Sequence, residues 1–88
     1  MTTAMTRDEA YLKLKPIFSD VLGHDDFSLA DGTTAEDVEG WDSLTHVSLI
    51  FAIEKAFGIA LTTREAKRMR NVGELVDLVV QKAGARRG

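Results

Sequence analysis

Apolar side chains recur every three or four residues over several stretches of the chain, which is the spacing of one face of an α-helix. The first stretch follows Thr6 and Glu9, whose types and spacing form a capping box, and it stops at a glycine. The pattern therefore predicts a helix over 7–22. Pro16 lies inside this range and predicts a kink or a break near Lys15, because proline has no amide hydrogen to donate.

A second helix is predicted over 43–57, and its apolar stripe is wide. We expect it to be the most buried helix of the fold. The stripe is formed by Leu44, Val47, Ile50, Phe51 and Phe57, with Leu49 and Ile53 beside it. Between the two helices, residues 24–41 show no sustained period and predict a long loop, which Phe27, Leu29 and Val38 would hold against the core.

Two further helices are predicted towards the C-terminus. A short one over 63–69 follows Thr62 or Thr63 as a cap, and a longer one over 72–84 follows Asn71, with Glu74 in the capping-box position. No stretch shows the strict alternation of a β-strand. The sequence thus predicts an all-α fold, a small four-helix bundle (three main helices plus a short third helix) that forms one domain over 1–88, with a long loop between the first and second helices.

Charge is divided unevenly along the chain, whose net charge is −3. Residues 20–42 hold eight acidic side chains and no Lys or Arg, whereas the chain from Lys55 onward holds eight basic side chains and three acidic ones. An acidic front half favours basic protein partners, because complementary fields speed encounter. The basic residues Arg64, Lys67, Arg68 and Arg70 do not predict nucleic-acid binding in a chain that is acidic as a whole; they are read as a solvated helix face or a contact with a partner protein.

Two features of the composition limit the chemistry. The chain has no cysteine, which excludes disulfides, thiolate metal sites and cysteine nucleophiles. It has no apolar run of about 20 residues and no signal-peptide layout, so we expect no membrane insertion and a cytoplasmic protein. We also expect no metal site, since His24 and His46 lack a spaced set of further ligands.

The most informative run is Asp42, Ser43 and Leu44, where the acidic loop meets the second helix. Amides in the first turn of a helix lack intrahelical partners and the helix dipole favours negative charge there, so a phosphodiester on Ser43 would be well placed. Ser43 would point outward, Leu44 would turn inward against the core, and Asp42 would help to position a metal-bound donor substrate or serve only as a helix cap. An enzyme built on Ser43 and His46 is disfavoured, because a domain of this size offers no enclosed pocket and no group to orient the base.

In these residues the chain resembles the acyl carrier protein family. The resemblance rests on Asp42, Ser43 and Leu44, and continues through Val47, Glu54, the run 57–59 and the run 71–75 that opens the last helix. It implies a carrier, not an enzyme, with 4′-phosphopantetheine from coenzyme A attached covalently to Ser43 by a phosphopantetheinyl transferase of the holo-acyl-carrier-protein synthase type. Acyl-loading enzymes and acyl-transfer or condensing enzymes would be the other partners, and the protein would act as a monomer in fatty acid, polyketide or specialised lipid biosynthesis.

The resemblance also implies two groups of residues around Ser43. Partners would dock at Glu36, Asp37, Glu39, Trp41, Thr45 and His46, and the acyl chain would lodge against Phe51, Ile59, Leu61, Ala66 and Met69. The chain departs from the usual family pattern in the second helix, where Glu54 is the one acidic residue, and in its basic third helix. These departures favour a dedicated carrier over one for bulk fatty acid synthesis.

Two other functions remain open at this point. An aminoacyl or peptidyl carrier has a similar fold and the same arm, and the sequence does not separate it from an acyl carrier. A helical interaction module that is never modified belongs to a different class. Modification by a transferase would separate this module from either carrier.

Overall fold

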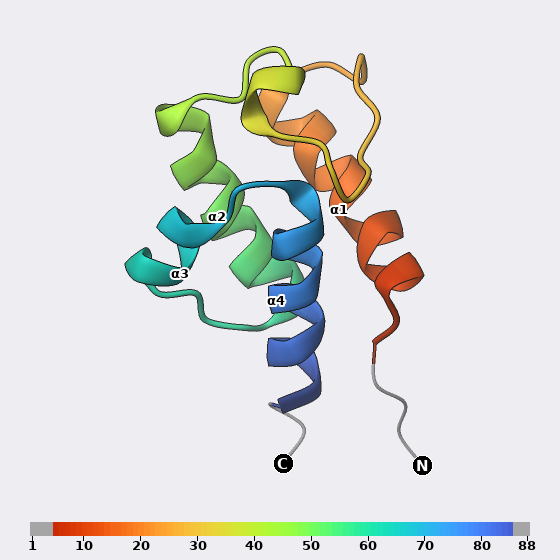
Figure 1. Ribbon diagram of the computed structural model, residues 1–88, viewed down its shortest axis with the longest axis vertical. Helices are drawn as coiled ribbons and strands as arrows, with labels where there is room; N and C mark the ends of the chain where they lie inside the picture. Colours follow the sequence, from red (N-terminus) through yellow and green to blue (C-terminus); the bar gives the residue numbers. More distant parts are fainter. Residues whose placement is uncertain (1–4, 86–88) are drawn as a thin grey trace.

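The computed structural model describes residues 5–85 of the chain and shows four α-helices (Figure 1). They are α1 (Arg7–Leu22), α2 (Ser43–Phe57), α3 (Thr63–Arg68) and α4 (Val72–Ala85), with a 3-10 turn, η1 (Ala35–Asp37), inside the long loop. The predicted all-α class is confirmed, and no predicted helix end differs from the structure by more than one residue. The sequence predicted no regular structure in the long loop, and the structure shows the short turn η1 there.

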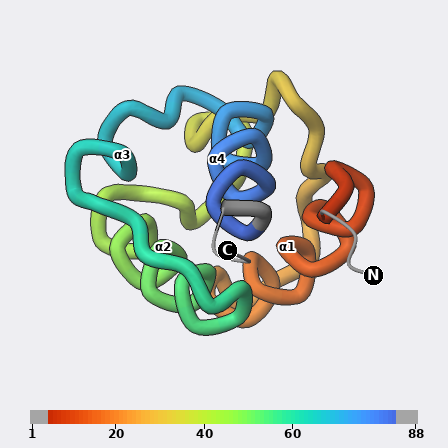
Figure 2. Tube along the Cα trace, turned by 90° about the horizontal axis from the view of Figure 1, so that it is seen from below, coloured from red at the N-terminus to blue at the C-terminus, as the bar shows by residue number. Residues whose placement is uncertain are grey.

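Three helices surround the core. α1 packs against α2 and α4, while the short α3 lies at the periphery on the side away from α1 (Figure 2). The fully buried large side chains are Phe18, Leu14, Leu49, Ile53, Val72, Val76 and Val79. α4 supplies more buried side chains than α2, so the expectation that the second helix is the most buried is wrong.

Local capping signals set the helix starts. The Thr6 hydroxyl accepts the Glu9 amide while the Glu9 carboxylate accepts the Thr6 amide, and Thr62 and Glu65 repeat this exchange at α3. α1 continues unbroken through Pro16. Of the two expected outcomes, a kink or a break near Lys15, the break is therefore wrong. A proline removes only one hydrogen bond, and the buried residues on either side hold the helix in place.

The apolar stripe of α2 divides into two faces. Leu49, Ile53 and Phe57, spaced by four residues, face the core, whereas Leu44, Val47 and Phe51 are 80%, 54% and 63% exposed. At about 100° per residue, Leu44 lies roughly 140° around the helix from Leu49, and both cannot face inward. The prediction that Leu44 turns inward is therefore wrong.

The long loop closes over the start of α4. Val38 is buried, and Phe27 and Leu29 are half-buried against the core, as expected. The loop carbonyl of Thr33 accepts the Val72 amide at 2.8 Å, and that of Asp31 accepts the Gly73 amide at 3.0 Å. These two amides have no partner within α4, so the loop supplies what the helix lacks.

Asp31 also holds α1 to this loop. Its carboxylate accepts hydrogen bonds from the Tyr11 hydroxyl and the Arg7 guanidinium, and Arg7 reaches Asp77 of α4 as well. Burial, and then the hydrogen bond to Asp31, raise the pKa of Tyr11 to about 12. The hydrogen bonds from Tyr11 and Arg7 lower the pKa of Asp31.

Candidate functional site

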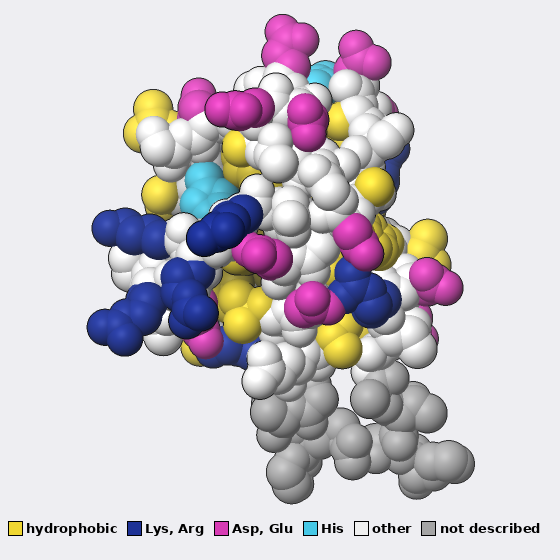
Figure 3. Space-filling view, viewed as in Figure 1, with side chains coloured by type: hydrophobic (Ala, Val, Ile, Leu, Met, Phe, Trp, Pro, Cys, Tyr) yellow, Lys and Arg dark blue, Asp and Glu magenta, His cyan; other side chains and the backbone are white. Residues whose placement is uncertain are grey.

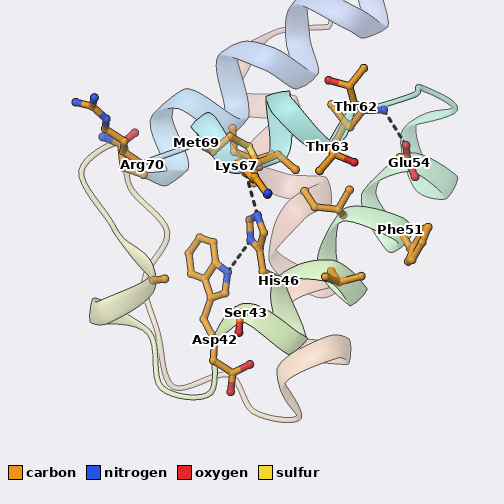
Figure 4. Close-up of a pocket in the computed structure, with 18 residues that line it drawn as sticks. Asp42, Ser43, His46, Phe51, Glu54, Thr62, Thr63, Lys67, Met69 and Arg70 are labelled. Carbon is orange, nitrogen blue, oxygen red and sulfur yellow. Dashed lines mark hydrogen bonds between the residues drawn. The ribbon is translucent and has the colours of Figure 1, made fainter.

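Ser43 is the first residue of α2, at the end of the long loop. Its side chain is exposed, and within residues 5–85 no hydrogen bond engages its hydroxyl. Figure 4 shows Ser43 beside Asp42 at one end of a cavity. The hydroxyl is thus accessible to another protein.

Asp42 is the cap of α2. Its Oδ1 atom accepts the amides of Leu44 and Thr45, both at 3.0 Å, and these bonds, the one from Thr45 first, lower the pKa of Asp42. The Thr45 hydroxyl in turn accepts the Asp42 amide at 2.8 Å. Asp42 therefore occupies two of the first-turn amides that were expected to favour a phosphate, those of Leu44 and Thr45.

A cavity of about 690 Å³ opens next to Ser43, between α2 and α3. Its apolar lining includes Val47, Ile50, Phe51, Leu61, Ala66, Met69 and Leu75. Four of the residues predicted for an acyl pocket, Phe51, Leu61, Ala66 and Met69, are among them. Ile59 is not: it packs half-buried against the core, where the link after α2 turns back.

His46 joins the two walls of this cavity. The Trp41 indole donates to its Nδ1 atom at 3.1 Å, and its Nε2 atom lies 3.1 Å from the Ala66 carbonyl oxygen. Because the indole only donates and the carbonyl only accepts, the ring hydrogen must lie on Nε2. Both ring nitrogens are engaged, so His46 is not available to activate Ser43 as a base.

Several polar groups around the cavity are already engaged within the chain. Glu54 accepts the Leu61 amide at 2.7 Å, Thr62 caps α3 and Asn71 caps α4. The Glu74 carboxylate accepts the Arg70 amide and not the Asn71 amide, so the predicted capping box at α4 is only half formed. With these groups satisfied internally, the cavity offers mainly apolar surface to an occupant.

The predicted docking residues fall into two sets. Glu36, Asp37 and Glu39 are exposed on the loop, and Asp37 also accepts hydrogen bonds from the amide and hydroxyl of Thr34. Trp41, Thr45 and His46 are half-buried, and Trp41 and His46 form part of the cavity wall. Sequence reasoning missed this Trp41–His46–Ala66 link, because no local pattern brings α3 to His46.

Comparisons with known proteins agree with this geometry. Residues 13–79 match the family model described as "Phosphopantetheine attachment site". The acyl carrier protein of Rubrobacter xylanophilus is 38% identical over 78 residues, covering 88% of this chain and 95% of that protein, and that of Guillardia theta is 37% identical over 82 residues, covering 92% and 100%. The solution structure of holo acyl carrier protein from Geobacter metallireducens superposes with a TM-score of 0.79 at 39% identity, covering 88% of this chain and 87% of that one.

The fold and the matched family define a small helical carrier domain. The chain belongs to the acyl carrier protein family, as its sequence predicted. It is therefore a carrier on which enzymes act, not a catalyst, and its prosthetic group is 4′-phosphopantetheine. Among the described residues, no helix is both long and apolar enough to span a bilayer.

Proposed function

We propose that Ser43 is the attachment point of the phosphopantetheine arm. The observation that carries this proposal is the exposed hydroxyl at the start of α2, with no internal hydrogen bond among the described residues and a cavity beside it. These residues fit the group: Ser43 supplies the ester oxygen, Asp42 keeps the helix start intact, and the loop leaves the hydroxyl in solvent. When bound, the arm supplies a terminal thiol that holds an acyl group as a thioester.

We further propose that this cargo is an acyl intermediate of fatty acid, polyketide or specialised lipid biosynthesis. The cavity walls are largely apolar, and their charged residues are of both signs, Asp42 and Glu54 with Lys67 and Arg70. A hydrocarbon chain would bury apolar surface there, whereas the ammonium group of an aminoacyl cargo would lose hydration against the apolar walls. The cavity therefore favours an acyl carrier over an aminoacyl or peptidyl carrier, with Phe51, Leu61, Ala66 and Met69 as the contacts.

Intact-mass measurement tests the attachment site. The apo chain is incubated with coenzyme A, magnesium and a broad-specificity phosphopantetheinyl transferase; we expect the mass of one arm to be added. Ser43→Ala should gain nothing. Ser48→Ala is the matched control, because Ser48 is another exposed serine on α2, and it should be modified like the original chain. No gain by the original chain, while a control carrier is modified, would favour the unmodified interaction module.

Docking of the transferase on the acidic loop is part of the same proposal. Glu36→Gln with Glu39→Gln should slow modification several-fold at low salt and little at high salt, because salt screens exposed charges. Asp37 is left in place because it holds η1. The control is Asp8→Asn with Asp20→Asn, which removes the same charge from the exposed surface of α1, outside the loop. Equal slowing by both pairs would show that net charge, and not the loop, matters.

The partners follow from the attachment. A transferase of the holo-acyl-carrier-protein synthase type would modify Ser43, and enzymes that load, transfer or condense acyl groups would act on the cargo. Trp41, Thr45 and His46 stay predicted as docking residues; their half-burial supports a role in shaping the cavity wall next to the docked enzyme. A monomer in the cytoplasm stays part of this proposal.

A further inference from the structure

The short helix α3 has little apolar surface with which to pack against its neighbours. None of its residues is buried, and its one apolar residue, Ala66, is half-buried beside the cavity. Arg64, Lys67 and Arg68 are exposed, and Figure 3 shows Lys and Arg side chains gathered over α3. Because hydrophobic burial stabilises α3 so little, polar contacts with other helices contribute much of what holds it in place.

Two side chains from other helices supply such contacts. Lys82 of α4 pairs with Glu65 at 2.7 Å and donates to the Ala60 carbonyl oxygen, in the link before α3, at 2.9 Å. His46 of α2 donates through Nε2 to the Ala66 carbonyl oxygen at 3.1 Å, at the wall of the cavity (Figure 4). Among residues 5–85, this is the only hydrogen bond that joins α2 directly to α3.

Trp41 holds the His46 ring in the orientation that this bond needs. Its indole donates to Nδ1 at 3.1 Å, which leaves the ring hydrogen on Nε2 for Ala66. The Trp41 ring in turn packs edge-on against Phe18, with centroids 5.1 Å apart, and Phe18 is fully buried. A continuous link thus runs from the core, through Trp41 and His46, to α3.

We propose that His46 is a positioning residue that holds α3 in place as one wall of the acyl cavity and so keeps the cargo enclosed. This inference rests on the proposed function, in which the cavity takes an acyl chain. Such a chain would bury apolar surface against both α2 and α3, and would become exposed when the two walls separate. The His46–Ala66 bond opposes that separation, and a hydrogen bond of typical net strength favours the closed state about fivefold.

Solvent exchange of backbone amides, followed by NMR on the apo chain, tests the link without any cargo. In His46→Leu the amides of residues 66–68 should exchange about fivefold faster than in the original chain, because leucine fills the space but forms no hydrogen bond. His46→Gln should restore slow exchange, since its side-chain amide can accept from Trp41 and donate to Ala66. Circular dichroism confirms the fold of each variant.

His24 provides a matched control, because both of its ring nitrogens are also engaged. Its Nδ1 atom accepts the Asp26 amide at 3.0 Å and its Nε2 atom lies 2.7 Å from the Glu39 carbonyl oxygen, within the loop and not at α3. His24→Leu should therefore leave exchange at residues 66–68 unchanged. NMR of the ring nitrogens in the original chain adds a measurement that needs no variant: neutral His46 should carry its hydrogen on Nε2.

Enclosure of the cargo is measured on the holo chain loaded with a decanoyl group. Hydroxylamine cleaves a thioester that it can reach, so the cleavage rate follows the fraction of time that the cargo is exposed. Cleavage should be about fivefold faster in His46→Leu than in the original chain and in His46→Gln. An acetyl group is too short to be buried between the helices, and its thioester should be cleaved equally fast in all three chains.

The apo and loaded chains give separate answers. Unchanged exchange at residues 66–68 in His46→Leu, an equal increase in His24→Leu, no recovery in His46→Gln, or a hydrogen on Nδ1 of neutral His46 would each overturn the proposal, whether or not Ser43 is modified. Equal cleavage of the decanoyl thioester in His46→Leu and the original chain would overturn the enclosure of cargo. Failure of the arm to attach would overturn the proposed function and this enclosure with it, while the exchange rates still decide whether His46 holds α3.

Discussion

The starts of α2 and α4 use similar capping chemistry and yet have opposite surroundings. Asp42 caps α2 by accepting two first-turn amides through a side-chain oxygen, and Asn71 caps α4 by accepting one. At α4 the next two amides are covered by loop carbonyls and Val72 is fully buried. At α2 the corresponding residue, Ser43, is exposed.

We infer from this difference that the start of α4 contributes to stability and the start of α2 to function. The covered start of α4 anchors a loop that would otherwise cost entropy to order, so changes there should act on the free energy of unfolding. The start of α2 is stabilised by its own cap, Asp42, and Ser43 is exposed there. A change at Ser43 should therefore leave the core undisturbed. The loop is thus held against α4, while the Ser43 hydroxyl stays within reach of another protein.

Gly73→Ala should give the largest effect on stability. A Cβ atom there would lie 2.9 Å from both the Cβ and the carbonyl oxygen of Asp31, so the loop must move away from α4. We expect a loss of about 1–3 kcal/mol in the free energy of unfolding, measured by chemical denaturation. Gly32→Ala is the matched control, because its added Cβ meets nothing within 4 Å. Equal losses in the two variants would contradict the close approach of loop and helix.

Asn71→Ala should lower the free energy of unfolding by less than Gly73→Ala does, about 1 kcal/mol, because α4 loses its cap. Chemical denaturation measures this loss.

The cap of α2 differs from that of α4 in its dependence on pH. Because the pKa of Asp42 is lowered in the folded state, its contribution is present above the unfolded pKa of about 3.9 and is lost as pH falls through the lowered value.

Denaturation across acidic pH checks this difference between the caps. Asp42→Asn keeps an accepting oxygen that does not titrate, so its unfolding free energy should fall less steeply in acid than that of the original chain. Asn71→Ala should follow the original slope. Parallel curves for all three proteins would rule out an ionised cap at α2.

Tyr11 reports on the loop that covers α4. As the single tyrosine of the chain, it can be titrated by tyrosinate absorbance, and we expect a pKa of about 12 in the folded protein against about 10 unfolded. The contribution of this group to stability is therefore complete below pH 10 and is lost as pH rises from about 10 to 12. Asp31→Asn should lower the pKa of Tyr11, because the carboxylate no longer opposes its ionisation; an unchanged value would assign the shift to burial alone.

Ser43→Ala should have the smallest effect on the free energy of unfolding, within about 0.5 kcal/mol, since the hydroxyl is exposed and makes no hydrogen bond within the described structure. Denaturation of the apo form measures it. A loss comparable to that of Gly73→Ala would show that Ser43 is part of the packing, and the contrast between the two helix starts would fail.

Local signals made the helix ends predictable, because caps such as Thr62 with Glu65 depend on residues three apart. The orientation of α2 was not predictable in the same way. It carries apolar residues on two faces, so only its packing into the core decides that Leu49 faces inward and Leu44 outward.

Long-range contacts were beyond sequence reasoning for a similar cause. The backbone of Asp31 approaches Gly73, and His46 reaches Ala66, through positions that the fold alone brings together. Ser43, in contrast, could be proposed from the sequence, because its surroundings are local: the end of an acidic loop, a cap and a helix start.

In the proposed function, Ser43 and no other hydroxyl carries the arm. Fragmentation mass spectrometry of the chain after reaction with coenzyme A and the transferase locates the added mass. We expect all of it on Ser43. Added mass on Ser19, Ser28, Ser48 or any threonine would contradict it.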